Sequence, residues 1–348
     1  MLKKLVFITL LLGIVSALAI VNLAQLRLQK PLSLSAEGTT YRVTDGASVK
    51  RVLADFSANG WIDYPRIHEL WLRYNELTVI QRGEYALQPG QTSTDVIRMM
   101  VSGKKILRSV QFIEGQTFSE FLQVLADSPD LEHSLTGLDQ DAIMQLVAAD
   151  MSFYEGWFFP DTYLFDAGTS DLDILKLAHQ RMVSILAEEW AQKSPTAVVE
   201  TPYEALILAS IIEKETGAAF ERPMISGVFS RRLSINMRLQ TDPTVIYGAG
   251  AAYTGNLTRG HLRTDTPYNT YTRNGLPPTP IANPGREAIF AALNPAAGES
   301  LFFVAKGDGS HHFSITFKEH NAAVRRYQRF SRRQDYKSAP ATTTDEVQ

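Results

Sequence analysis

The sequence contains no cysteine among its 348 residues. This absence excludes disulfide bonds, zinc sites built on thiolates and a thiol nucleophile. An excess of charge of one sign is missing as well, because 34 basic and 37 acidic residues give a net charge of −3. The chain therefore lacks the basic field of a nucleic-acid-binding protein, and we expect no nucleic-acid partner.

Sequence motifs that would hold a metal or a cofactor are also missing. His311 and His312 are adjacent, but no HExxH pattern and no acidic ligands at helical spacing accompany them. The sequence YGAG at 247–250 is too weak a match to a phosphate-binding loop and follows no predicted strand. We therefore expect neither a metal ion nor a cofactor.

One hydrophobic run, at the N-terminus, is long enough to cross a membrane. Two lysines precede an apolar stretch from Leu5 to Leu26, which as a helix would be roughly 33 Å long. Small residues at 16–19 would suit signal-peptide cleavage, but apolar residues continue beyond them. We predict a retained anchor, with residues 1–27 forming a cytoplasmic tip and a transmembrane helix.

Residues 28–106 begin with a short polar tether and continue as a small module. The pattern predicts a strand near Tyr41, a helix after the cap residue Ser48, a helix starting near Pro65, a strand at GEYAL and a helix ending at Gly103. This order, with GEYALQPGQT at the second strand, resembles a LysM-like glycan-binding module. A spacer domain without a ligand stays the alternative.

The rest of the chain, residues 107–336, shows a mixed pattern of helices and strands. We predict a strand at 110–113, helices at 118–126 and 171–193, a hairpin at 300–317 and a terminal helix. Residues 236–300 are rich in Pro, Gly, Asn and Thr with little periodicity, so loops are expected there. Residues 337–348 are predicted to be a disordered tail. These patterns indicate an α+β protein.

Two glutamates end a stretch that is otherwise built for burial. The apolar run Leu206–Ile212 leads into Glu213 and Glu215, which lie about 200° apart on a helix and point to different sides. Glu215 follows Leu208 by seven residues and Ile211 by four, so it extends the apolar stripe. Glu213 falls on another face, where we expect it to pair with a cation or to meet water.

A carboxyl that continues a buried stripe has two interpretations. It can be a structural acid, satisfied by an arginine such as Arg222 or Arg231. It can instead form the floor of a cleft, where apolar walls raise its pKa and keep it protonated for general acid catalysis. The pattern around Glu215 alone leaves both open.

Polar-aromatic loops in the C-terminal half are suited to line a groove for sugars. The candidate ligand-binding residues are Gln240, Thr241, Asp242, Tyr247, Asn269 and Tyr271. Asp242 has a structural alternative, because Asp followed by Pro243 is a common start of a helix, with the Asp as its cap.

Five motifs in order carry a family resemblance: EGWFFPDTY, ASIIEKET, RLQTDPTVIYG, YNTY and GLPP. Together they resemble the YceG-like family, the endolytic murein transglycosylases, over nearly the whole chain. The resemblance implies a single-pass cell inner membrane enzyme whose catalytic domain, residues 107–336, faces the periplasm. It implies cleavage of the MurNAc–GlcNAc β-1,4 bond in nascent peptidoglycan strands, giving 1,6-anhydro-MurNAc ends and limiting strand length near the peptidoglycan synthases.

The resemblance also implies that Glu215 is the catalytic residue, with one carboxyl acting as acid and then as base. Two other functions stay open. A hydrolytic muramidase would use Asp242 as a second carboxylate, because hydrolytic glycosidases generally need two. A wall-binding scaffold without enzymatic activity would leave Glu215 exposed, with no adjoining groove.

Overall fold

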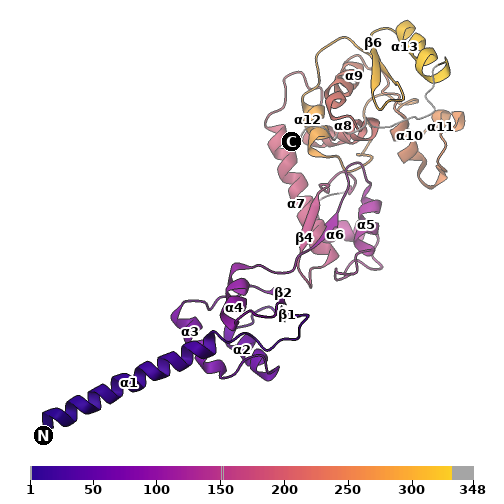
Figure 1. The fold of residues 1–348 in the computed structure, drawn as a ribbon. Helices are drawn as coiled ribbons and strands as arrows, with labels where there is room; N and C mark the ends of the chain where they lie inside the picture. The colour runs from indigo at the N-terminus through magenta and orange to yellow at the C-terminus, as the bar shows by residue number, and fades with distance from the viewer. Residues whose placement is uncertain (1, 150, 152, 331–348) are drawn as a thin grey trace. The chain divides into compact units, whose positions relative to one another are not determined.

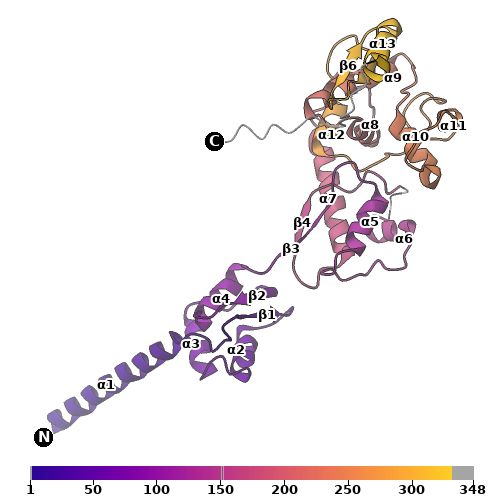
Figure 2. The same ribbon diagram turned by 45° about the vertical axis from the view of Figure 1, so that its right-hand side comes forward.

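The computed structural model describes residues 2–149, 151 and 153–330 (Figures 1 and 2). The predicted tail at 337–348 and the end of the predicted domain 107–336 lie outside these residues. The chain divides into two compact units. The first runs to Arg108 and includes Leu164–Gly168, and the second comprises Ser109–Tyr163 and the chain from Thr169 onward.

Helix α1 (Leu2–Leu28) is long and apolar, as the N-terminal run predicts. Its segment Phe7–Leu28 has 22 residues with a mean hydropathy of 2.4 and is not buried in the protein. By length and composition this helix can cross a membrane. At its end, Lys30 lies 2.9 Å from Asp63 in an ion pair that ties the helix to the rest of the first unit.

The rest of the first unit is built on one antiparallel strand pair and three helices. In chain order these are β1 (Thr39–Val43), α2 (Val49–Ala58), α3 (Pro65–Tyr74), β2 (Gly83–Leu87) and α4 (Ser93–Ser102). The strands pair from Thr39 opposite Leu87 to Val43 opposite Gly83. The predicted order of strands and helices is confirmed, whereas the likeness to a LysM module stays a prediction.

Local signals set the helix ends in this unit. The Ser48 hydroxyl accepts a hydrogen bond from the Arg51 amide at the start of α2, as predicted. Thr92 and Asp95 form a reciprocal capping box at the start of α4. Gly103 ends α4 with φ of 71°, a left-handed conformation that glycine adopts without strain.

The second unit holds most of the helices. Its elements are α5 (Phe118–Ala126), α6 (Gln140–Val147), α7 (Asp171–Trp190), α8 (Pro202–Glu215), η1 (Ala219–Glu221), α9 (Arg222–Ser234), α10 (Asp242–Ala249), η2 (Gly250–Ala252), α11 (Arg259–Arg263), α12 (Arg286–Leu293), β5 (Phe302–Ala305), β6 (His311–Ser314), α13 (Phe317–Val324) and η3 (Arg325–Phe330). Strands β5 and β6 pair antiparallel, and β3 (Arg108–Gln111) pairs with β4 (Thr162–Phe165) near the division between the units.

The expectation of loops throughout 236–300 is wrong, because α10, α11 and α12 lie there. These helices have eight residues or fewer, too few for a clear 3.6-residue period. Helix α12 is nevertheless central, since its alanines and Ile289 are buried and pack against α8 and α7. Small side chains let the helices approach closely, and the sequence pattern does not reveal this.

Helix α8 forms the centre of the core of the second unit. Every residue from Ala205 to Ile212 is buried, so the helix is enclosed on all sides and has no single apolar stripe. Helices α7, α9, α10 and α12 all pack against it, as Figure 1 shows for α7, α9 and α12. Its burial ends where Glu213 and Glu215 begin, and the two acids emerge at the surface of the core.

Candidate active site

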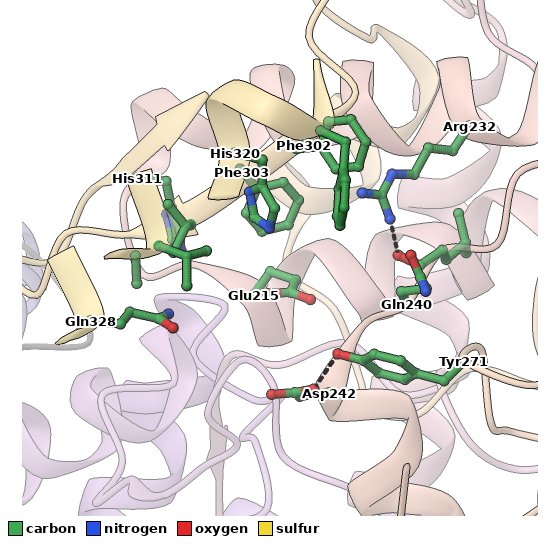
Figure 3. Close-up of a pocket in the computed structure, with 15 residues that line it drawn as sticks. Glu215, Arg232, Gln240, Asp242, Tyr271, Phe302, Phe303, His311, His320 and Gln328 are labelled. Atoms are coloured by element: carbon green, nitrogen blue, oxygen red, sulfur yellow. Dashed lines mark hydrogen bonds between the residues drawn. The ribbon is translucent and has the colours of Figure 1, made fainter. Parts of the chain in front are cut away.

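A cavity of about 490 Å³ opens at the C-terminal end of α8, around Glu215 (Figure 3). Its walls come from α8, α9, the segment leading into α10, the β5–β6 hairpin and α13. The lining residues include Glu215, Arg232, Leu239, Gln240, Asp242, Tyr271, Phe302, Phe303, His311, Phe317, His320 and Gln328. A concave site of this size, apolar on one side and polar on the other, suits a small ligand or part of a polymer.

Glu215 is the last residue of α8, and its carboxyl points into this cavity. The hydroxyl of Thr241 donates a hydrogen bond to Glu215 Oε1. The predicted structural partners Arg222 and Arg231 do not bind it. Arg222 binds Glu213, and Arg231 donates to the backbone carbonyls of the segment after α12.

The surroundings of Glu215 favour its neutral form. The pKa of its carboxyl is raised to about 7, mainly by burial and to a smaller extent by the nearby charge of Asp242. The hydrogen bond from Thr241 and the charge of Arg232 act in the opposite direction. Protein surrounds the Glu215 carboxyl closely, but the carboxyl keeps some access to the cavity. A large fraction of it is therefore protonated near neutral pH, as general acid catalysis requires.

Asp242 and Tyr271 form the wall opposite the hairpin (Figure 3). The Tyr271 hydroxyl donates to Asp242 Oδ1 over 2.6 Å. The prediction that Asp242 caps α10 is wrong: Thr241 occupies the cap position and Asp242 is the first helical residue. The Thr241 hydroxyl makes no capping bond because it is directed at Glu215.

Arg232 fixes the backbone beside Glu215. Its guanidinium donates to the carbonyl oxygens of Leu239 at 2.7 Å and of Leu301 at 2.6 Å. It also lies 5.1 Å from the centre of the Phe302 ring, a cation–π contact. Gln240, which follows this anchored position, has a φ of 51°, a strained conformation for a residue with a side chain.

Two of the candidate ligand-binding residues are buried structural groups. Asn269 is fully buried, and its amide donates to three backbone carbonyls between His261 and Thr264. Its side-chain oxygen accepts the amide of Tyr271 at 2.9 Å, so it positions that residue. Thr241 is 3% exposed and reaches only Glu215. In this structure Asn269 therefore supports Tyr271 from within the protein, and a direct contact between Asn269 and a ligand stays a prediction.

Tyr247 lies away from the Glu215 cavity. It lines a second cavity of about 750 Å³, where its hydroxyl donates to Glu155 Oε2 at 3.1 Å. The structure thus brings Gln240, Asp242 and Tyr271 together with Glu215 in one cavity. It does not bring Tyr247 there, because Tyr247 lies more than one helical turn further along α10.

Glu213 has a structural environment. Its carboxylate lies 3.0 Å from Arg222 and accepts the Gly285 amide at 3.0 Å, and its side chain is 5% exposed. The same arginine also binds Glu287 on α12. Of the two outcomes expected for Glu213, a cation or water, the structure shows the cation.

Several residues of the cavity have no signal in the sequence that indicates their role. Arg232 lies in the interior of α9 with no motif around it, and its role is apparent only from its backbone partners. Phe302, Phe303 and His311 belong to the predicted hairpin, but nothing in the sequence places this hairpin over α8. Within the described part of the chain, no group of three or more His, Asp or Glu residues could hold a metal ion.

Comparisons with known proteins agree with this fold. A sequence profile of the YceG-like family matches residues 41–326. A Bacillus subtilis (strain 168) protein named endolytic murein transglycosylase is 30% identical over 303 residues, covering 82% of this chain and 83% of that protein. A Streptococcus pneumoniae (strain ATCC BAA-255 / R6) protein of the same name is 25% identical, covering 83% of this chain and 58% of its own length.

A solved structure gives the same result. The crystal structure of a YceG-like protein from Listeria monocytogenes aligns with a TM-score of 0.53 and 30% sequence identity, over 83% of this chain and 99% of that one. The family profile and a relative at 30% identity each span most of the sequence. The resemblance carried by the five motifs is confirmed, and the chain belongs to the YceG-like family.

Proposed function

We propose that this protein is a lytic transglycosylase of peptidoglycan that cuts inside nascent glycan strands. Two relatives bear the name endolytic murein transglycosylase, and the family profile covers the unit that holds the cavity. The observation that carries the proposal is Glu215, a carboxyl with its pKa raised to about 7 that opens into a formed cavity. A scaffold without catalysis would have no need of such a group.

The proposed reaction uses Glu215 twice. Its protonated carboxyl donates to the glycosidic oxygen between MurNAc and GlcNAc as the bond from C1 breaks. The resulting carboxylate then takes the proton from the C6 hydroxyl of the same MurNAc while C6 oxygen bonds to C1. The strand is cut with a 1,6-anhydro end, no water is consumed, and Glu215 is protonated again. The internal nucleophile is already adjacent, which replaces a positioned water.

The other residues of the cavity have supporting roles in this scheme. Thr241 orients the Glu215 carboxyl, and its hydrogen bond stabilises the carboxylate formed after proton donation. Gln240 and Tyr271 line the cavity and are proposed to hydrogen-bond the sugar. Asp242 has one oxygen bound to Tyr271, which favours an orienting role over that of a second catalytic carboxylate.

We also propose where the protein is located in the cell. Helix α1 would hold the enzyme in the cell inner membrane, with the rest of the first unit and the whole second unit in the periplasm, where nascent strands are made and synthases work. The module of residues 28–106 would add a glycan contact. Deleting this module should weaken retention of the protein on insoluble peptidoglycan in a pull-down, and unchanged retention would reduce it to a spacer.

The mass of the released ends tests the chemistry. Purified full-length protein in detergent is incubated with peptidoglycan in heavy-oxygen water, and the new MurNAc ends are analysed by mass spectrometry. We expect anhydro ends without label, because the ring closes on its own oxygen. Labelled reducing ends would identify hydrolysis and assign Asp242 the second catalytic role.

A further inference from the structure

The second cavity, of about 750 Å³, is larger than the one around Glu215 and has no role so far. It lies between the N-terminal end of α5, the loop that carries Glu155, helix α10 and η2. Tyr154, Tyr247, Ile246 and Tyr253 contribute to its lining. Its volume is within the range of about 300–1,000 Å³ that is typical of ligand sites.

Two short backbone segments contribute neighbouring residues to both cavities. Lys214 lines the second cavity, and the next residue, Glu215, lines the first. In the same way Asp242 lines the first and Pro243 the second. Consecutive Cα atoms are about 3.8 Å apart. The end of α8 and the start of α10 therefore form a thin divider, and the catalytic carboxyl is located on it.

The second cavity has the chemistry of a neutral sugar site. Tyr154 and Tyr253 offer aromatic faces, Pro243 and Ile246 offer apolar surface for N-acetyl methyl groups, and Gln140 offers hydrogen bonds. Its only cation among the lining residues, Lys214, is opposed by two acids. This balance disfavours a phosphate or another anion and favours N-acetylglucosamine, the uncharged sugar of the strand.

Glu155 holds the walls of this cavity in place. It is 4% exposed, and one oxygen accepts the Phe118 amide at the start of α5, at 2.9 Å, and the Asn283 amide at 3.3 Å. The other accepts the Tyr247 hydroxyl of α10 at 3.1 Å. Gly156 follows with φ of 84°, and a Cβ there would come within 2.6 Å of Pro280. These contacts hold the walls of the second cavity in place without a ligand.

We propose that the second cavity binds the glycan strand on the opposite side of the scissile bond from the sugars held beside Glu215. The inference rests on the proposed function. An enzyme that cuts within a strand must hold sugars on both sides of the bond, and we assign the cavity at Glu215 to one side and the second cavity to the other. Tyr253 stacks on a sugar ring, and the divider places the bond to be broken at Glu215.

Binding to an inactive protein tests this without turnover. Peptide-free glycan strands of defined length are titrated into full-length Glu215→Gln protein in detergent by calorimetry. Adding Tyr253→Ala removes the stacking ring, and adding Ser119→Trp fills the cavity from an exposed position on α5. We expect each to weaken binding of long strands by about tenfold, the scale of one lost aromatic contact.

Matched controls use the same changes elsewhere in the second unit. Phe220→Ala truncates an exposed aromatic residue, and Ser184→Trp adds a bulky residue on the exposed face of α7; neither position lines either cavity. Both should bind long strands like the Glu215→Gln parent. If the cavity variants bind strands as tightly as these controls, the second site is overturned.

Turnover separates this inference from the proposed function. In a background with Glu215 intact, Tyr253→Ala should raise KM for long strands and shift cleavage towards strand ends, with anhydro ends still formed. If the unmodified protein releases no anhydro ends, the proposed function fails, whatever the binding data show. If anhydro ends form with an unchanged length distribution in Tyr253→Ala and Ser119→Trp, the function stands and the second site fails.

Discussion

Glu215 and Glu155 both have a raised pKa, but they differ in how far they are enclosed and in how many hydrogen bonds they accept. Burial raises the pKa of each carboxyl to about 7. Glu155, however, is enclosed, and its oxygens accept hydrogen bonds from Phe118, Asn283 and Tyr247. Glu215 has one described hydrogen bond, from Thr241, and opens into a cavity. A raised pKa alone therefore does not identify a catalytic acid; access to a ligand and free lone pairs do.

Glu213 completes the comparison. It lies two residues from Glu215 on the same helix, yet Arg222 and the Gly285 amide bind it as a carboxylate. Because the side chains of Glu213 and Glu215 leave α8 in different directions, they meet different partners. We propose that the three acids serve as a reactive group (Glu215), a structural charge (Glu213) and a tie between cavity walls (Glu155), and four substitutions test these assignments.

The largest effect is expected for Glu215→Gln. The amide keeps the shape of the side chain but cannot deliver a proton, so turnover should fall by at least about 10²-fold, the lower end for general acid catalysis. The circular dichroism spectrum and glycan binding should stay as in the unmodified protein. Retained turnover would remove Glu215 from the reaction.

Glu213→Ala should act on folding. It leaves the buried guanidinium of Arg222 without its main partner, and breaking such a pair costs about 3–5 kcal/mol. Part of this cost is offset because Glu287 and Glu114 also lie near that guanidinium. We expect a lower urea midpoint, with per-molecule activity retained in the fraction that stays folded. An unchanged urea midpoint together with lost activity would instead place Glu213 in the catalytic reaction.

Glu155→Gln tests the pH dependence of stability. A carboxyl whose pKa rises from 4.5 to about 7 on folding stabilises the native state below pH 4.5, and this contribution is lost as the pH rises through about 7. It amounts to about 3 kcal/mol. Glutamine does not titrate, so the stability of the variant relative to the unmodified protein should increase between pH 4.5 and 8.

Urea unfolding at a series of pH values measures this difference. A constant offset between the two proteins across that range would show that Glu155 does not change its protonation on folding. Glu204→Gln serves as a control, since its carboxylate accepts one hydrogen bond, from the Glu200 amide at the start of α8, and lines neither cavity.

The smallest effect is expected for Thr241→Val. The Thr241 hydrogen bond lowers the pKa of Glu215, so its removal should raise that pKa. The basic limb of the pH–rate profile, where protonated Glu215 is lost, should move to higher pH. Turnover at low pH should change little. A limb that moves to lower pH, or stays in place, would contradict the assigned hydrogen bond.

Local sequence signals predicted the helix limits and the position of the acid. Ser48 and Gly103 mark the ends of α2 and α4 because caps depend on a few neighbouring residues. Glu215 was found because its place at the end of an apolar run reflects its place at the edge of the core. Helix α8 is buried on all sides, so the predicted apolar stripe is only part of its buried surface.

Long-range contacts account for what the sequence did not show. The three carbonyl partners of Asn269 make it structural, and they are formed only when the chain folds back on itself. The partner of Tyr247 is Glu155, which lies 92 positions earlier in the chain. The hairpin over Glu215 was predicted as a hairpin, but its packing position depends on Arg232, whose backbone partners have no local signature.

The guanidinium of Arg232 connects α9 to two other segments, the one that leads to Thr241 and the one that begins the hairpin. Both sides of the cavity are thus ordered by one buried side chain. A flexible loop would lose conformational freedom each time a ligand bound, and this loss would weaken binding. Here the loss of chain entropy occurs once, during folding, and is not repeated for each strand that enters the cavity.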